Sequence, residues 1–339
     1  MISPRSLTSR LDRLGTRPQR LIGLAVARIG LGATFVLIYL SNLQYRNLLW
    51  GPHGAADFDQ FRDSMNSPRR YSLYMISEST PWFNAVFFTG LIVAVLWTVY
   101  GTRPLTLLHA IFVWSLYERN ESLLDGGDNL NRILVILLIF TTTNAYFSPG
   151  AKKVRARLAS REPRPRAATS MHNVAATLVV FQTVVVYAVA GLWKVVGSRW
   201  REGNALYYIT RVDEFSTNSV MPWLMKDPFL LTGATYLTIA VQLAIVPAAL
   251  TRRRRFREGV LLLIVGMHLG IMYGMGLVSF GLFMMAGDTT ILNDDDYRAA
   301  RRNLRATVGR IRHRHSRLDQ SRPHGSPAPK PRALEDIRT

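Results

Sequence analysis

The chain has 339 residues, of which 48% are hydrophobic, with a formal net charge of +20 and no cysteine. Without cysteine there are no disulfides, thiolate nucleophiles or sulfur-bound metals, so any chemistry must come from lysine, histidine, carboxylates, tyrosine or a bound cofactor. So basic a chain often binds nucleic acid, but here the basic residues lie in short blocks between apolar runs too long for a soluble fold. Anionic membrane lipid is therefore the expected partner, and nucleic acid is not.

A basic leader, 1–20, precedes the first apolar run, 21–40, which is long enough to span a bilayer. No small-residue cleavage site follows this run, so we expect a retained helix and not a signal peptide. Arg28 lies inside it, and two interpretations stay open. The guanidinium either snorkels to the inner surface or is a buried cation that awaits a carboxylate.

Further apolar runs predict helices that cross the membrane, separated by polar or glycine- and proline-bearing turns. They are 82–100, 105–117, 133–147, 174–196, 229–250 and 260–292. As one helix the last run would be close to 50 Å long, at roughly 1.5 Å per residue, whereas the hydrocarbon core is about 30 Å thick. It must therefore break, most easily near Gly274, Gly276 and Gly281, which gives about eight transmembrane segments.

The placement of charge favours that count. With an even number of crossings, the leader, the Pro- and Arg-rich connector 148–173, the arginine block 252–257 and the tail from Arg298 all fall on one side. The positive-inside rule makes that side cytoplasmic. We therefore expect an all-α, polytopic integral membrane protein with one membrane domain, 21–295, and both termini in the cytoplasm. The Pro-, Ser- and Arg-rich tail, 296–339, is expected to be disordered.

One element stands out at the end of the 174–196 run, where Gly191 to Gly203 places Lys194 at the outer surface. Trp200 and two tyrosines follow, as in the aromatic belts that lie at headgroup level. Lys194 is then either an interfacial anchor that snorkels, or a desolvated amine that works as a base.

A second polar element leads into the 133–147 run and reads Asp125-Gly-Gly-Asp128-Asn-Leu-Asn-Arg132. Asp125 or Asp128 could cap the following helix by accepting its free backbone N–H groups. The alternative is a polar cluster that faces a cavity near Lys194. Its members would be Arg28, Asp125, Asp128, Asn129, Asn131, Arg132 and Gln242.

His268 lies deep in the 260–292 run. A single histidine in a membrane helix can simply hydrogen-bond a neighbouring helix. It could also form a proton-abstracting group with Lys194 and a carboxylate from the outer side. The sequence leaves both interpretations open.

Three ordered motifs carry a resemblance to a known family. They are Ala27-Arg28-Ile29, Gly191-Leu-Trp-Lys194 continuing to Trp200-Arg-Glu-Gly203, and His268-Leu-Gly-Ile-Met-Tyr-Gly-Met-Gly-Leu-Val-Ser-Phe280. Together they resemble the HTTM family, the horizontally transferred transmembrane domain of vitamin K-dependent gamma-carboxylases and of bacterial sporulation-delaying protein B. The resemblance covers about residues 15 to 295.

Within that family the chain is more similar to the sporulation-delaying protein B type. Asp125-Gly-Gly-Asp128 is present, and no large lumenal domain follows the membrane part. This resemblance implies a factor in a bacterial-type cytoplasmic membrane that helps to mature or export a secreted peptide toxin. Its partners would be the toxin precursor and a companion maturation protein.

The carboxylase type implies a different function, namely a membrane enzyme that uses a lipid quinol and no metal. Lys194 matches the position of the carboxylase base, and His268 matches the histidine before the last spans. The carboxylase pattern also has a histidine after asparagine in its polar segment, whereas Asp128-Asn129-Leu130-Asn131 contains none. A third alternative is a non-catalytic scaffold in which Lys194 is only an anchor.

Overall fold

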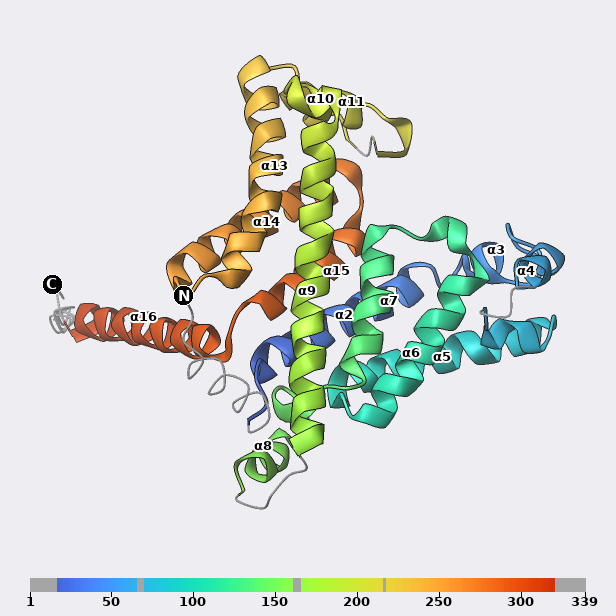
Figure 1. Cartoon of the computed structure of the whole chain (residues 1–339), viewed down its shortest axis with the longest axis horizontal. Helices are drawn as coiled ribbons and strands as arrows, with labels where there is room; N and C mark the ends of the chain where they lie inside the picture. The colour runs from blue at the N-terminus through green and yellow to red at the C-terminus, as the bar shows by residue number, and fades with distance from the viewer. Residues whose placement is uncertain (1–16, 66–69, 161–165, 216–217, 321–339) are drawn as a thin grey trace, which may run out of the picture. The chain divides into compact units, whose positions relative to one another are not determined.

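The computed structural model describes residues 17–65, 70–160, 166–215 and 218–320, with side chains as far as residue 308. Every regular element in these ranges is a helix (Figure 1). The chain divides into two compact units, Met1–Asp294 and Asp295–Thr339, which are described separately. The predicted all-α fold is confirmed for the described residues.

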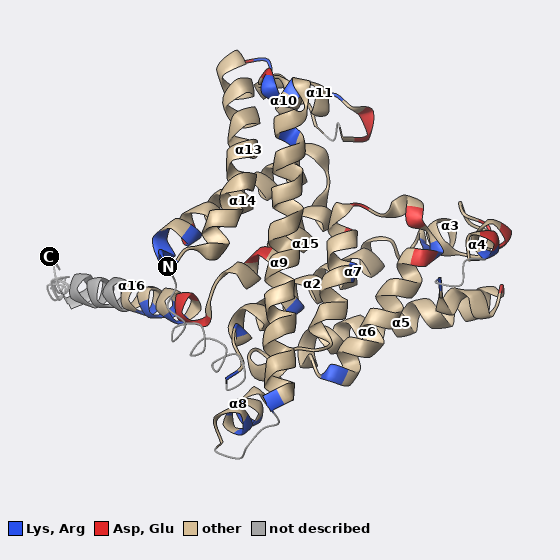
Figure 2. Ribbon diagram, viewed as in Figure 1, with Lys and Arg blue, Asp and Glu red and all other residues tan. Residues whose placement is uncertain are grey.

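Five helices of the first unit are long and apolar enough to cross a membrane. They are α2 (Leu21–Ser41), α5 (Thr80–Tyr100), α9 (Arg166–Val196), α13 (Pro228–Leu250) and α14 (Arg254–Met275). Figure 2 shows that charged residues lie mostly at the ends of the helices and in the connecting segments, so that their middles are largely uncharged. These helices indicate a multi-pass membrane protein.

Three other helices were expected to cross the membrane and are not among these five candidates. They are α6 (Arg103–Arg119), α7 (Gly126–Leu138) and α15 (Val278–Asp288), with 17, 13 and 11 residues. At about 1.5 Å per residue, α15 is roughly 16 Å long, about half of a hydrocarbon core. The structure thus supports a multi-pass helical fold but does not confirm the count of about eight.

Short helices connect the long ones. The α-helical connections are α3 (Arg46–Trp50), α4 (Phe58–Ser64), α8 (Ala151–Ala159), α10 (Ser198–Arg201), α11 (Ala205–Ile209) and α12 (Val220–Leu224). The 3₁₀ turns are η1 (Leu73–Ile76), η2 (Glu121–Leu123), η3 (Thr143–Ala145), η4 (Asp213–Phe215) and η5 (Thr289–Ile291).

The predicted break in the 260–292 run is confirmed. α14 ends at Met275, and Gly276 follows with φ 70°, a left-handed conformation that glycine adopts without steric cost. α7 begins at Gly126, inside the polar segment that leads into the 133–147 run, because Asp125 caps it. One start differs from the prediction, since α9 begins at Arg166 inside the expected connector, where alanines favour the helix.

α15 packs against α2, α7, α9 and α14. Small residues allow this close packing. A Cβ on Gly30 of α2 would lie 2.7 Å from the Cβ of Ala286, and one on Gly281 would lie 2.4 Å from Cγ of Met272 in α14. In membrane proteins such residues let helix backbones approach, since lipid offers no hydrophobic drive to bring helices together. The shortest of these helices is therefore the one that the others surround.

A carboxylate from the end of the first unit closes the beginning of α2. The residue before the helix, Arg20, makes no side-chain cap. Instead Asp294 accepts hydrogen bonds from the backbone N–H groups of Leu21, at 3.2 Å, and Ile22, at 2.8 Å. These N–H groups have no partner within the helix, and a negative charge at the N-terminus also interacts favourably with the helix dipole.

The second unit corrects an expectation. The tail from residue 296 was expected to be disordered, but α16 (Asp294–Gln320) is helical, and only 321–339 lies outside the described residues. The helical part contains no proline and is rich in arginine, with several alanines, and both residue types favour helices. Aspartates at its beginning complement the helix dipole, and Arg298 bonds Asp295 at 2.8 Å.

Candidate functional site

The first compact unit, Met1–Asp294, contains the five candidate spans and is called the membrane unit here. Three side chains from three helices meet in its interior. The Tyr187 hydroxyl, on α9, lies 2.7 Å from Nε2 of His268, on α14, and donates a hydrogen bond of 2.9 Å to Oδ2 of Asp288, at the end of α15. Their relative exposures are 1%, 1% and 3%. We name this group the buried triad. Polar groups at such a depth are costly in a membrane protein and usually mark a functional site.

The buried triad reaches the Asp125-Gly-Gly-Asp128 segment through Phe280. The Phe280 ring lies edge-on to His268, with 5.7 Å between ring centroids. A Cβ on Gly127 would lie only 2.8 Å from the Cα of the same Phe280. Gly127 thus lets the beginning of α7 contact the backbone that carries Phe280. The His268–Phe280 motif and the Asp125–Asp128 segment are therefore in contact, with Phe280 lying between His268 and Gly127.

Within that segment the capping interpretation is confirmed. Asp125 accepts from the N–H groups of Gly127, at 2.7 Å, and Asp128, at 3.0 Å, while Asp128 accepts from the N–H of Asp125, at 3.1 Å. This is a reciprocal capping box. Burial raises the pKa of Asp128 to about 6. α7, which carries Asp128, is not one of the five candidate spans.

The remaining polar residues of α7 face α6. Tyr117 donates to Asp128 at 2.8 Å and accepts from the Asn131 amide at 3.0 Å. Arg132 pairs with the buried Glu118 at 3.4 Å, bonds Asn129 at 3.2 Å, and lies 5.0 Å above the Trp114 ring. The contacts of these residues therefore tie α7 to α6, and none of those described is with Lys194.

Lys194 lies at the other end of α9. Its half-buried amine is 3.5 Å from the Ala190 carbonyl and 4.9 Å from the centre of the Trp200 ring. Both contacts are made within its own segment, and neither is with His268. An amine held over a tryptophan near a helix end is the arrangement of an interfacial anchor.

The other residues of this motif pack α9 and the following turn on α13. A Cβ on Gly191 would lie 2.7 Å from Leu243 and 3.4 Å from Gln242. Gly203, with φ 74°, would place a Cβ 2.9 Å from Thr232. Gln242 is buried, and its Oε1 has no partner among the described residues. The glycines are thus required for close packing, whatever the role of Lys194.

Arg28 neither snorkels nor meets a carboxylate. It is fully buried and donates to the carbonyls of Val99, at 3.3 Å, and Phe147, at 2.9 Å. Val99 is in the last turn of α5, where carbonyls lack helical partners and the helix dipole favours a cation. Arg28 therefore joins α2 to the end of α5 and to the loop after η3, away from the buried triad.

Sequence reasoning missed Tyr187 and Asp288. Each had a local signal, because Asp288 is the one carboxylate between 260 and 292 and Tyr187 the one tyrosine between 174 and 196. An ionisable group in an apolar run of that length calls for a named partner. The sequence pattern could have singled out both residues without showing that they meet.

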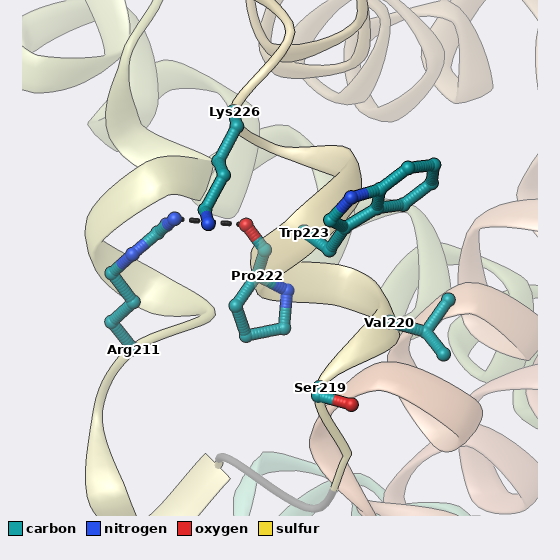
Figure 3. A pocket seen from close by; sticks show the side chains of 6 residues that line it. All are labelled: Arg211, Ser219, Val220, Pro222, Trp223 and Lys226. Carbon is teal, nitrogen blue, oxygen red and sulfur yellow. Dashed lines mark hydrogen bonds between the residues drawn. The ribbon is translucent and has the colours of Figure 1, made fainter.

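A hollow of about 560 Å³ lies beside α12, in the segment of the chain that joins α11 to α13 (Figure 3). It is lined by Arg211, Ser219, Val220, Pro222, Trp223 and Lys226. The Arg211 guanidinium donates to the carbonyls of Pro222, at 2.8 Å, and Tyr207, at 2.7 Å. Figure 3 shows Arg211 and Lys226 pointing toward the Pro222 carbonyl, with Trp223 beside it. The lining residues carry two positive charges and no negative one.

No protein-family model, no curated protein and no solved structure matches the chain. The described residues contain no group of histidines and carboxylates placed to hold a metal ion. The site is thus defined by its own geometry, namely a buried triad between α9, α14 and α15, an anchored lysine and a cationic hollow.

Proposed function

We propose that this protein is an HTTM-type, sporulation-delaying protein B-like factor of a bacterial cytoplasmic membrane, which assists the maturation or export of a secreted peptide toxin. The observation that carries the proposal is the cationic hollow beside α12. Trp223 is 66% exposed beside it, and Tyr207 and Tyr208 are exposed nearby. The resemblance of the ordered motifs gives the class of function, and the hollow offers a place for the substrate.

The chemistry of the hollow suits an apolar peptide with a free carboxylate. Arg211 and Lys226 provide positive charge, Trp223 provides an aromatic surface, and α13, which follows in the chain, is apolar. Arginine and lysine bind carboxylates through charge-assisted hydrogen bonds. In this proposal the toxin precursor binds at the membrane surface, and a companion maturation protein acts on it there.

The test is the secretion of peptides by a host from which the gene has been deleted. Mass spectrometry of the medium is expected to show one small peptide that disappears on deletion and returns with the wild-type gene. Trp223→Ala with Arg211→Gln should restore it several-fold less well than wild type. Arg201→Gln, in α10 and outside the hollow, is the matched control. An unchanged peptide profile after deletion would contradict the proposal.

A second candidate function, a membrane enzyme that uses a lipid quinol, is favoured by the buried triad. His268 Nδ1 and Asp288 Oδ1 are buried atoms without partners among the described residues. Both can accept hydrogen bonds from quinol hydroxyl groups, which supports this candidate. When bound, a quinol would supply reducing equivalents, while His268 and Asp288 would orient its hydroxyl groups. Lys194 would be the base in this hypothesis.

Substitutions at Lys194 separate the enzyme from a non-catalytic scaffold. An anchor tolerates Lys194→Arg, because both side chains snorkel, whereas a base that must lose its proton does not. Peptide secretion, or any activity found, is the measurement. Activity lost in Lys194→Ala and retained in Lys194→Arg would exclude Lys194 as a base and leave the anchoring role.

A further inference from the structure

The direction of the hydrogen bonds in the buried triad can be worked out from its atoms. Tyr187 has one hydroxyl hydrogen, which it donates to Oδ2 of Asp288. Its oxygen must therefore accept from His268, so that Nε2 of the imidazole carries a hydrogen. The chain of donation runs in one direction, from His268 through Tyr187 to Asp288.

Each end of this chain carries a buried polar atom that has no partner among the described residues. At one end it is Nδ1 of His268, and at the other it is Oδ1 of Asp288. A buried acceptor without a partner costs free energy, so each of these two atoms is a place where a proton or a polar group would bind favourably. A group that only joined three helices would not need an open atom at both ends. A path along which protons pass needs one at each end.

We propose that His268, Tyr187 and Asp288 form a proton relay inside the membrane unit. A proton binds Nδ1 of His268. The Nε2 hydrogen then moves to the Tyr187 oxygen as the Tyr187 hydrogen moves to Oδ2 of Asp288. The imidazole is left neutral in the opposite tautomer, the tyrosine is unchanged and the carboxylate is neutral. One proton has crossed the buried triad, no bond between heavy atoms has changed, and no oxidant or reductant is required.

Several other titratable groups on the surrounding helices have partners of their own. Asp125 and Asp128 on α7 form the capping box, and Arg28 on α2 binds two carbonyls. His172, at the beginning of α9, contacts Thr142 and Gln19. Lys194 is seven residues from Tyr187 along α9, which corresponds to about 10 Å. Glu258 on α14 bonds Arg254 at 2.7 Å.

The proposal does not depend on the proposed function, because it concerns the protons of the chain itself. The experiment uses the full chain in nanodiscs of phosphatidylethanolamine and phosphatidylglycerol. Histidine is labelled with ¹⁵N, and the signal of His268 is the one among seven histidines that His268→Gln removes. The ¹⁵N shifts report which ring nitrogen carries the proton. Infrared spectra report the carbonyl stretch of protonated Asp288, assigned by its loss in Asp288→Asn.

On acidification, the relay requires the His268 proton to move from Nε2 to Nδ1 at the pH at which the Asp288 carbonyl band appears. Tyr187→Phe should separate the two events, since the phenyl ring cannot carry a proton between them. Tyr236→Phe is the matched control, because its hydroxyl bonds only the Arg201 carbonyl at 2.6 Å in the described structure. In that variant the two events should still coincide.

Two results would overturn the relay. One is a His268 proton that stays on Nε2 while Asp288 becomes protonated. The other is a tautomer change that still coincides with the carbonyl band in Tyr187→Phe. If Tyr187→Phe does not fold, Asp288→Asn decides, since an amide cannot take up the relayed proton. In that variant His268 should become doubly protonated without a tautomer change, and a tautomer change there would refute the proposal.

Discussion

Tyr187 and Lys194 lie on the same helix, α9, but their polar groups have opposite environments. At Tyr187 the group is enclosed by three helices and bonded to His268 and Asp288. At Lys194, about 10 Å along the helix, the amine is half-buried and rests on Trp200 of its own segment. A charge near a helix end can reach the interface, whereas a polar group in the middle must find a partner on another helix. The sequence motif identified Lys194 as a candidate, whereas the packing of the helices identifies Tyr187.

The largest expected effect tests the enclosure around the buried triad. In Gly127→Ala the methyl group would lie 2.8 Å from the Cα of Phe280 and 3.1 Å from its carbonyl oxygen. Backbone atoms cannot rotate away, so we expect the free energy of unfolding to fall by about 2 kcal/mol. Gly126→Ala is the matched control, because its nearest atom is the Phe280 Cε2 at 3.5 Å, an ordinary contact.

Unfolding midpoints in nanodiscs, followed by tryptophan fluorescence, measure this difference. If Gly126→Ala and Gly127→Ala were equally stable, the close approach of α7 to Phe280 would be wrong. The ¹⁵N signal of His268 provides a second check, because a displaced Phe280 ring should shift it in Gly127→Ala alone.

The second effect comes from the buried triad itself. Tyr187→Phe leaves Nε2 of His268 and Oδ2 of Asp288 without the hydroxyl between them. Hydrogen bonds between membrane helices contribute roughly 0.6 to 1.7 kcal/mol, so we expect a loss of about 1.5 kcal/mol in the free energy of unfolding. Tyr236→Phe, at an exposed position, should cost less than half of that. Equal losses would mean that burial gives the Tyr187 contacts no additional weight.

A smaller effect is expected at the beginning of α7. Asp125→Ala removes the acceptor for two backbone N–H groups and should lower the free energy of unfolding by about 1 kcal/mol. Asp125→Asn retains an oxygen acceptor and should lose only a few tenths of that. Thermal unfolding of the two variants, side by side, measures the capping contribution. An alanine variant as stable as the asparagine variant would contradict it.

The smallest effect is expected at the contact between Lys194 and Trp200, near the end of α9. Trp200→Leu removes the ring beneath the Lys194 amine, and an exposed cation–π contact contributes about 0.5 kcal/mol. Lys194→Ala should cost a similar amount, since the amine has only a weak contact with the Ala190 carbonyl besides. If either variant lost more free energy of unfolding than Tyr187→Phe in the same assay, the Lys194 contact would stabilise the protein more than the buried triad does, contrary to our expectation.

Much of the fold could be predicted from local sequence. The spans at 21–40, 82–100 and 229–250 agree closely with α2, α5 and α13, because the length and polarity of an apolar run are visible residue by residue. The break after α14 was also predictable, since glycine is needed for the left-handed residue at Gly276. The lengths of α6, α7 and α15 were not, because polar ends and capping shorten a helix within an apolar run.

The candidate site was predictable only in part. His268 was identified from its position in an apolar run, but its partners were not. Tyr187 and Asp288 lie 81 and 20 residues away in the chain, the first of them on another span. One of the two interpretations of the polar residues 128–132 placed them near Lys194, whereas their described contacts beyond α7 are with α6. The direction in which a helix faces depends on all its neighbours.

The sequence by itself predicted a helical chain with several membrane-spanning segments, the ends of α2, α5 and α13, and the break after α14. Each of these follows from interactions within a few residues, or from the contrast between an apolar run and water. Only the tertiary structure decided that His268, Tyr187 and Asp288 meet, that Arg28 binds carbonyls and that Lys194 rests on Trp200. A buried polar group takes the partner that packing places beside it, and packing depends on the whole chain.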